Sequence, residues 1–424
     1  MGFVFGHRHH PGRRRRPVPL DRRDPAWRKP PFEGVYGSGS PSYGPLVTTR
    51  AHPKAVEAVE RAVARASSAE EVFLAAGDAL REAVPFDGSM WFGVDPGTLL
   101  ATAPAVMEGL DSGYCDVFWH REFHEHDASL FRDLVRSAEP AAALRQVTAD
   151  SPGRSGRYRE FLAPQGYDDE LRVVFRSGDS PWAMAALLRA EGRPAFDAAD
   201  VAVVTAVSAV VGAALRTHAV LAATGPTGPE APGLLLFDEH GRLRSANAEA
   251  ARWVGDVFGA APDPDAGWVQ FLAQPADDLR IPTPLTSLLS HARAVAAGHE
   301  PGPARLRVRD RSGRWLVLHA SCLAAPGSTG DVAVVIEPAK SAEIAPIIIE
   351  AYGLTARERD VVRAIARGSS TPEIASELYL SPHTVRDYVK TVFEKVGVSS
   401  RGELVAKLFA EHYTDSFHAA AIHV

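Results

Sequence analysis

Hydrophobic positions in residues 51–222 alternate between helical and strand spacing. A helical pattern opens the segment, and a long apolar helix at 198–219 closes it. Turn-forming residues stand at Asp95-Pro96-Gly97 and at 177–180, each between two apolar runs, which is typical of hairpins. Four strands are expected, at 88–94, 99–103, 171–175 and 182–188. This pattern predicts one α/β domain over 51–222.

A second α/β unit is expected at 233–340, after a Gly- and Pro-rich linker at 223–232. A helix should begin at 247, and turn residues stand at 238–241 and 309–313. Five strands are expected, at 234–237, 243–246, 304–308, 315–321 and 332–336.

Helix start and stop signals become dense within 341–413 and predict four short helices. Thr355 and Glu358 have capping-box spacing at the first helix, and Gly368 suits its end. The second helix should begin at Pro372, capped by Thr371. The third should run from a Ser381 cap to Gly397, and the fourth from a Ser400–Glu403 capping box to about His412. Only Tyr379 and Leu380 separate the second helix from the next cap, which is helix-turn-helix spacing.

The third of these helices has an aliphatic side and a polar side when it is read at 100° per residue. Four valines should face a small core: Val385, Val389, Val392 and Val396. Five polar residues project on the opposite side: His383, Arg386, Asp387, Lys390 and Glu394. Thr384 and Lys395 lie on one flank. Such a helix can enter a major groove, where Arg reads guanine and Lys reaches a base or a phosphate.

Composition limits these interpretations without choosing among them. The chain has 424 residues and a net charge of −6, so several domains are expected and binding of nucleic acid by the whole chain is not. Two distant cysteines predict neither a disulfide scaffold nor a zinc site.

Residues 1–50 predict a disordered basic tail, which is either simply solvated or a DNA-binding arm, and 414–424 a second tail. Residues 201–215 favour a buried helix over a membrane span, so we expect a cytoplasmic protein.

The net charge of the C-terminal helices does not decide between two possible roles. Residues 351–413 hold nine Lys and Arg against eight Asp and Glu, so the segment is nearly neutral. It is therefore either a DNA-binding unit or an interaction module that docks a partner protein.

A resemblance favours DNA. Four blocks in correct spacing resemble the LuxR-type helix-turn-helix: Leu354-Thr-Ala-Arg-Glu-Arg-Asp-Val-Val, Ala-Arg-Gly-Ser-Ser-Thr-Pro-Glu-Ile-Ala, Leu-Ser-Pro-His-Thr-Val-Arg386 and Glu-Lys395-Val-Gly-Val-Ser-Ser-Arg401. The resemblance implies double-stranded DNA as the partner, bound by a homodimer at an inverted repeat.

The resemblance also implies roles for single residues. Arg386 and Lys390 stand at the basic groove-facing positions. Thr384, Lys395 and Arg401 match positions that touch phosphates or steady the fold. Glu358, in the opening motif, matches a structural position.

The sequence departs from the family pattern at two residues of the third helix. Asp387 places a carboxylate on the groove face, where it repels phosphate but can accept from cytosine. Tyr388 replaces a frequent histidine. These departures affect the expected target sequence and leave the expected activity unchanged.

The two preceding units resemble known sensor domains. The order of elements in 51–222 resembles a GAF domain. The order of strand, Asp-x-x-Gly turn, strand, Asn-Ala helix and three closing strands in 233–340 resembles a PAS domain. These resemblances imply a small-molecule or protein signal, and no cofactor is identifiable from them.

Catalytic and metal signatures give no competing function. The chain lacks a Gly-x-Ser-x-Gly elbow, a His-Glu-x-x-His motif, a phosphate loop and a dinucleotide fingerprint, so we expect no enzyme. His120 and His124 have the i,i+4 spacing of a metal pair, but no further ligand group is identifiable, and no metal is assigned. Six aromatic residues either line a ligand pocket or form plain core: Trp91, Phe92, Phe118, Trp119, Phe123 and Phe131.

The sequence thus predicts a multidomain chain. Two α/β sensor-type domains, with antiparallel sheets and helices, precede an all-α four-helix helix-turn-helix domain. The predicted function is a transcription regulator that couples a sensed signal to DNA binding. The alternative is a ligand-binding or protein-interaction adaptor whose C-terminal helices dock a partner.

Overall fold

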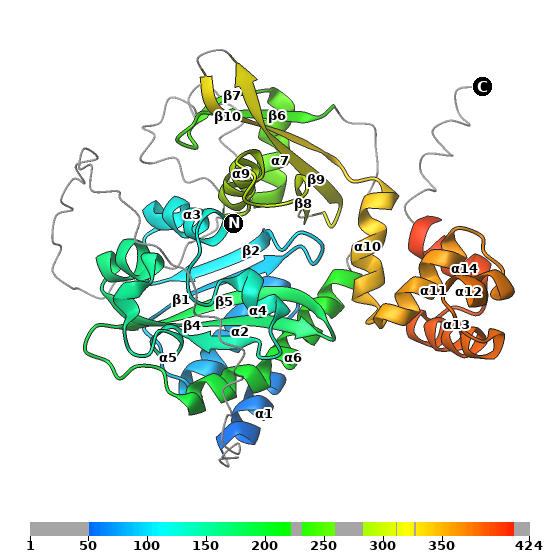
Figure 1. Cartoon of the computed structure of the whole chain (residues 1–424), viewed down its shortest axis with the longest axis horizontal. Helices are drawn as coiled ribbons and strands as arrows, with labels where there is room; N and C mark the ends of the chain where they lie inside the picture. Colours follow the sequence, from blue (N-terminus) through cyan, green and yellow to red (C-terminus); the bar gives the residue numbers. More distant parts are fainter. Residues whose placement is uncertain (1–50, 222–230, 259–282, 311, 326–327, 411–424) are drawn as a thin grey trace. The chain divides into compact units, whose positions relative to one another are not determined.

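The computed structural model describes residues 51–221, 231–258, 283–310, 312–325 and 328–410. The expected tails at 1–50 and 414–424 and most of the expected linker at 223–232 lie outside these residues. The described residues form two antiparallel sheets with helices, followed by the C-terminal helices, as predicted (Figure 1).

The first sheet belongs to residues 51–221, called here the first sheet domain. Its five antiparallel strands lie in the order β2-β1-β5-β4-β3. The strands are β1 (Gly88–Val94), β2 (Ala101–Glu108), β3 (Ala141–Ala143), β4 (Tyr167–Ser177) and β5 (Ser180–Ala190). Both predicted hairpins form, and β4 and β5 are longer than expected.

One predicted strand is misplaced, because β2 begins at Ala101 and not at residue 99. Leu99 has a φ of 62°, in the left-handed region, and its N–H donates to the carbonyl of Asp95. The turn therefore includes Leu99, and the strand starts only after it. The strand then extends to Glu108, which pairs with Ser89 of β1.

The first sheet is covered on both faces, because neighbouring residues of a strand point to opposite sides. Met90 and Phe92 of β1 belong to one hydrophobic cluster, and Trp91 between them belongs to the other. The Trp91 side is covered by three helices: α1 (Ala51–Val63), α2 (Ala69–Ala83) and α6 (Ala198–Leu221).

Helix α6 is the predicted long apolar helix. Its segment Ala198–Ala219 is long and apolar enough to cross a membrane, a property that core helices of soluble proteins share. Val204, Val207 and Val211 of α6 are buried against the sheet. Gly212 permits this packing, since a Cβ there would collide with the carbonyl of Arg176 in β4. Here α6 therefore packs as a core helix.

The other face of the first sheet carries α3 (Cys115–His124) and α4 (Phe131–Arg136). Short turns of helix complete this layer: η1 (Ser112–Tyr114), α5 (Leu144–Val147), η2 (Pro152–Arg154), η3 (Tyr158–Leu162) and η4 (Ala163–Gln165).

The second sheet belongs to residues 231–338, called here the second sheet domain. Its strands follow the order β7-β6-β10-β9-β8, which is the order of the first sheet when strands are numbered within each sheet. They are β6 (Gly233–Phe237), β7 (Leu243–Ala246), β8 (Ala304–Arg309), β9 (Trp315–Ala325) and β10 (Ser328–Pro338). Each contains its predicted strand. Helix α7 (Ala248–Phe258) begins after Asn247, whose side chain accepts from the Ala250 N–H at 2.9 Å.

Helix α9 (Thr283–Ala296) contacts both sheet domains. It packs against α3 and β2 of the first and against β8 and β9 of the second. Eleven of its 14 residues are buried. The Ser287 hydroxyl accepts from the Ala101 N–H at 3.2 Å, and His124 Nε2 lies 3.0 Å from the Ser290 carbonyl oxygen. The two sheet domains therefore share a core around α9.

Helix α10 (Ser341–Ala351), which the sequence analysis did not anticipate, precedes the C-terminal helices. Ile347 and Ala351 pack in the α1, α2 and α6 cluster. Ile344 and Ile348 pack in the cluster of the C-terminal helices. This one helix therefore contributes to two cores.

Candidate nucleic-acid interface

The C-terminal domain, as the term is used here, comprises four α-helices and a closing π-helical turn. They are α11 (Ala356–Ala366), α12 (Thr371–Glu377), α13 (Pro382–Val396), α14 (Arg401–Val405) and η5 (Ala406–Ala410). Thr355 caps α11, and the Glu358 carboxylate accepts from the Thr355 N–H at 2.7 Å, which closes the predicted capping box. Gly368 and Gly397 have left-handed φ values of 84° and 70°, as expected of residues that end helices.

The predicted cap of the second helix is wrong by one residue. Ser370 is the N-cap of α12, and Glu373 accepts from its N–H at 2.7 Å. Thr371 is the first helical residue instead. The Thr371 hydroxyl accepts from Arg401 at 2.8 Å. The side chain that was expected to cap the helix therefore makes a contact with a residue distant in sequence.

The fourth helix is capped by Ser400, whose hydroxyl accepts from the Glu403 N–H at 3.1 Å. The carboxylate of Glu403 accepts from the Ser399 N–H at 2.6 Å, so the predicted capping box is only half formed.

The turn between α12 and α13 is as short as the spacing predicted. Tyr379 lies within it at a φ of 56°, a left-handed conformation that favours glycine. Its side chain is 95% exposed. Two residues later the Ser381 hydroxyl accepts from the Thr384 N–H at 3.0 Å and starts α13.

The inner side of α13 is the predicted valine stripe. Val385, Val392 and Val396 are buried, and Val389 is half-buried against the same cluster. Val361, Ile365 and Ile374, from α11 and α12, complete this small core. The valines therefore fix which side of α13 faces outward.

The outer side of α13 carries the predicted polar residues. Arg386, Asp387 and Lys390 are all exposed. Asp387 is hydrogen-bonded by His383 at 2.9 Å, and Lys390 lies 3.9 Å from Glu394. Arg386 has no hydrogen-bond or ion-pair partner among the described residues. This face presents two exposed cations and one carboxylate that is already hydrogen-bonded.

The three flanking candidates make contacts within the domain. Thr384 is half-buried, and its hydroxyl lies 2.9 Å from that of Ser381. Arg401 donates to the Ser369 carbonyl at 2.7 Å in addition to Thr371. Lys395 donates to the Glu358 carboxylate at 2.7 Å. Lys395 therefore connects α13 to α11, Arg401 connects α14 to α12, and Thr384 belongs to the cap of its own helix.

Glu358 is the buried partner of this arrangement, at 4% exposure. Burial alone would raise the pKa of its carboxyl. Hydrogen bonds from Lys395 and Thr355 outweigh the burial and hold the pKa below its ordinary value. Glu358 therefore stays ionised and anchors Lys395.

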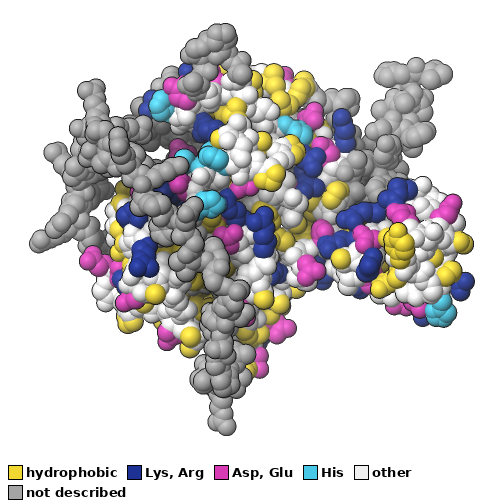
Figure 2. Space-filling view, viewed as in Figure 1, with side chains coloured by type: hydrophobic (Ala, Val, Ile, Leu, Met, Phe, Trp, Pro, Cys, Tyr) yellow, Lys and Arg dark blue, Asp and Glu magenta, His cyan; other side chains and the backbone are white. Residues whose placement is uncertain are grey.

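Two features of this surface were missed by sequence reasoning. The His383–Asp387 pair had a signal, because i,i+4 residues are neighbours on a helix. The exposed Tyr379 had none, because nothing local to it indicates a left-handed turn. Figure 2 shows basic and acidic side chains interspersed over the C-terminal helices, consistent with the nearly neutral count.

The other candidates from the sequence lie in the first sheet domain. The rings of His120 and His124 stack at 4.7 Å, and His124 also lies beside the Ser290 carbonyl. No group of three or more His, Cys, Asp or Glu that could hold a metal occurs among the described residues. The six aromatic residues are all buried and distributed between two core clusters, which favours the core interpretation over a pocket.

Comparison with protein families matches one segment. The model for bacterial regulatory proteins of the luxR family matches residues 353–408, which contain all four C-terminal α-helices.

Curated relatives match over the same part of the chain. The spore germination protein GerE of Bacillus subtilis is 42% identical over 55 residues, which are 13% of this chain and 74% of GerE. The probable transcriptional regulatory protein NarL of Mycobacterium tuberculosis is 41% identical over 91 residues. That match covers 22% of this chain and 39% of NarL's length. The transcriptional regulatory protein UhpA of Escherichia coli is 46% identical over 56 residues, 13% of this chain and 29% of UhpA.

Similarity to solved structures is weak. The phage VqmA–DPO complex is 20% identical, with a TM-score of 0.24, and the match covers 44% of this chain and 84% of that one. Escherichia coli SdiA is 10% identical, with a TM-score of 0.29, over 84% of this chain and 96% of SdiA.

Proposed function

The chain belongs to the luxR family of bacterial regulatory proteins, and from this we propose that it is a sequence-specific DNA-binding transcription regulator. The observation that carries the proposal is the division of α13 into two sides. Its valines are packed inside a helix-turn-helix, while Arg386 and Lys390 are exposed together on the outside. An exposed helix of this kind enters the major groove and reads bases through its side chains.

Arg386 is the base-reading residue in this proposal, because its guanidinium is exposed and has no partner to give up. Lys390, one turn further along, reaches a base or a phosphate. Asp387 accepts from a cytosine amino group on the same face, once it is released from His383. The three flanking residues support the structure of the C-terminal domain and lie close to the backbone of the duplex: Thr384, Lys395 and Arg401.

The DNA-bound form is a homodimer on an inverted repeat. A nearly neutral C-terminal domain with a carboxylate on its reading face makes few favourable contacts, and two-fold symmetry doubles them. Helix α6 is the proposed dimer or signalling helix, because it is long and apolar and part of its surface is exposed, for example at Ala206 and Ala209.

The two sheet domains are the proposed input, as GAF-like and PAS-like sensors of a small molecule or a protein. Their support is the order of elements: in each, two strands are followed by helix and then by three more strands with the same spatial order, although short helical turns separate β3 from β4. A cytoplasmic location follows from this function, since the regulator must reach DNA.

The test begins with selection of DNA sequences by the full chain. We expect an enriched inverted repeat. Arg386→Ala should then lower the affinity for that site by about 1–3 kcal/mol and relax the sequence preference at one position. Lys390→Ala should weaken binding and reduce the salt slope by about one unit. Arg363→Ala is the matched control, because it is an exposed arginine on α11 whose partner is Asp360.

Two results would contradict the proposal. Unchanged binding by both α13 variants removes the groove-facing assignment. Failure to enrich any motif, with a C-terminal domain that instead binds a protein at an affinity insensitive to salt, favours the adaptor function, because DNA binding weakens steeply with salt.

A further inference from the structure

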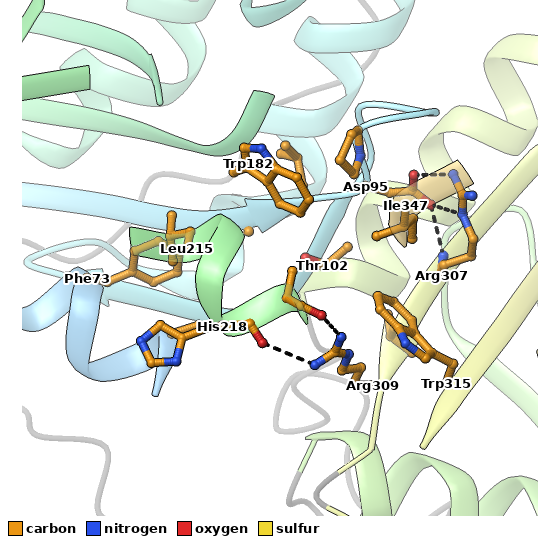
Figure 3. A pocket seen from close by; sticks show the side chains of 16 residues that line it. Phe73, Asp95, Thr102, Trp182, Leu215, His218, Arg307, Arg309, Trp315 and Ile347 are labelled. Carbon is orange, nitrogen blue, oxygen red and sulfur yellow. Dashed lines mark hydrogen bonds and ion pairs between the residues drawn. The ribbon is translucent and has the colours of Figure 1, made fainter. Parts of the chain in front are cut away.

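A cavity of about 140 Å³ lies where the two sheet domains meet α10 (Figure 3). Phe73 and Trp182 line it from the first sheet domain, and Arg309 and Trp315 from the second. Ile347 of α10 completes the lining. At ~30 Å³ per water molecule, the volume corresponds to roughly five waters, which suits a compact ligand.

The cavity has flat aromatic walls. Trp182 is 6% exposed, and the Nε1 atoms of both Trp182 and Trp315 are buried without a hydrogen-bond partner among the described residues. Buried tryptophan N–H groups usually have a partner. Because neither Nε1 atom is accessible to solvent, the cavity presents the flat ring surfaces, and not these N–H groups, to a ligand.

The cavity also holds a positive charge that no carboxylate balances. The guanidinium of Arg309 stacks on Trp315 at 4.3 Å and donates to the carbonyls of His218 and Ala219 at the end of α6. Its Nε has no partner, and no Asp or Glu pairs with it among the described residues. Burial lowers the pKa of Arg309 to about 10.

Arg307, two residues earlier on β8, is an arginine in the same region whose charge is balanced by a carboxylate. Its Nε donates to the Asp95 carboxylate at 2.7 Å, and both side chains are at most 2% exposed. Among the described residues, Arg307 therefore has a carboxylate counter-charge and Arg309 does not. A partly buried guanidinium without a carboxylate partner favours binding of an anion from outside.

We propose that this cavity is the binding site for a small aromatic carboxylate, with its ring against Trp182 and Trp315 and its carboxylate facing Arg309. The inference rests on the proposed function, because it names the chemical class of the small-molecule signal. The flat walls select a planar ring, and the guanidinium of Arg309 selects a carboxylate.

The position of the cavity explains how such a signal reaches DNA. Ile347 lines the cavity, while Ile344 and Ile348 of the same helix lie in the core of the C-terminal domain. Glu350, at the end of this helix, accepts from Ser180 of β5 and from Arg359 of α11. A ligand in the cavity therefore touches the helix that connects the two cores.

The test is calorimetric titration of the full chain with benzoate and with benzamide, its neutral counterpart. We expect benzoate to bind with a Kd below about 1 mM and benzamide to bind at least about tenfold more weakly. This pair needs no variant, so it remains decisive if a substitution disturbs folding. Absence of binding by benzoate, phenylacetate and indole-3-carboxylate up to about 10 mM overturns the inference, as does equal binding of benzoate and benzamide.

Variants locate the site. Arg309→Gln removes the charge and should weaken benzoate binding at least about tenfold. Arg305→Gln is the matched control on the same strand, where Arg305 lies 3.9 Å from Glu343 and outside the cavity lining. Full binding by Arg309→Gln overturns the assignment of the cavity.

A DNA arm separates this inference from the proposed function. The same preparations are titrated with the selected DNA, with and without benzoate. DNA binding without carboxylate binding overturns the inference and leaves the proposed function. Carboxylate binding that depends on Arg309, without DNA binding, supports the inference and overturns the proposed function.

Discussion

The first sheet domain and the C-terminal domain use charged side chains in opposite ways. The interior of the first sheet domain contains two arginines and two glutamates at 3% exposure or less: Arg157, Arg172, Glu122 and Glu170. Arg157 donates to Glu170 at 2.7 Å, and Arg172 donates to Glu122 at 2.8 Å and to Glu170 at 3.0 Å. The guanidinium of Arg172 also lies 4.4 Å from the centre of the Phe131 ring.

The C-terminal domain keeps its charges at helix ends and on its surface. Among the described residues after 340, Glu358 is the charged side chain that is buried, and it serves the cap of α11. The buried network of the first sheet domain connects elements that are far apart in sequence. The helices of the C-terminal domain, in contrast, begin and end at residues that interact over three or four positions. The first arrangement is fixed by the fold, and the second is visible in the sequence.

The largest expected effect comes from breaking the buried network. Arg172→Met should lower the free energy of unfolding of the first sheet domain by about 3–5 kcal/mol, because inside the protein Glu122 loses its arginine partner and Glu170 loses one of its two. Hydrogen exchange of β4 peptides across a urea series measures the loss. The matched control is Arg193→Met, which removes an ion pair with Asp87 in which the arginine side chain is 50% exposed. That variant should cost far less, because water screens an exposed ion pair. Equal losses in the two variants would erase the contrast between buried and exposed pairs.

The same contrast decides what the sequence could predict about the fold. The boundaries of α13 match the sequence prediction, because Ser381 and Gly397 set them through local backbone geometry. Glu122 lies between His120 and His124 in a segment rich in His and Glu, whose local pattern does not predict its burial. It is buried because Arg172, 50 residues away, pairs with it. No local pattern carries that information.

The candidate site also has some features that the sequence predicts and others that it does not. The exposure of Arg386 and Lys390 follows from helical periodicity alone. The intramolecular partners of Lys395 and Arg401 do not, since Glu358 and Ser369 lie more than 30 residues from them in sequence. The cavity at the domain junction was invisible to the sequence, because its lining comes from elements between residues 69 and 347.

A smaller effect is expected from the ion pair that steadies α13. Lys395→Met should lower the free energy of unfolding of the C-terminal domain by about 1–2 kcal/mol, since a hydrogen bond to a buried carboxylate is lost but the lysine is partly in water. Hydrogen exchange of α11 and α13 peptides measures the loss. Lys390→Met is the control, because Lys390 is 79% exposed and lies 3.9 Å from Glu394. A loss from Lys390→Met as large as that from Lys395→Met would contradict the structural role of Lys395.

The pH dependence of this pair has a definite sign. The pKa of Glu358 is lower in the folded domain than its ordinary value of 4.5. The stability it contributes is therefore fully present above pH 4.5 and is lost as the pH falls through the folded pKa. Glu358→Gln keeps an acceptor for the cap but cannot ionise. We expect its stability deficit relative to the parent chain to shrink as the pH is lowered below 4.5, and a deficit independent of pH would argue against the ionised pair.

The smallest expected effect concerns the turn between α12 and α13. It tests whether this turn, like the helix caps, is determined by the local sequence. Tyr379 holds a left-handed φ of 56° while its side chain is 95% exposed, so replacing it removes almost no packing. Tyr379→Gly should raise the free energy of unfolding by up to about 1 kcal/mol, because glycine relieves the left-handed strain while losing more entropy on folding. Thermal unfolding of the full chain, with hydrogen exchange of α12 and α13 peptides, measures the change. Tyr379→Ala keeps the Cβ and should give no gain, and an equal gain from alanine would place the effect in the tyrosine ring and not in the backbone.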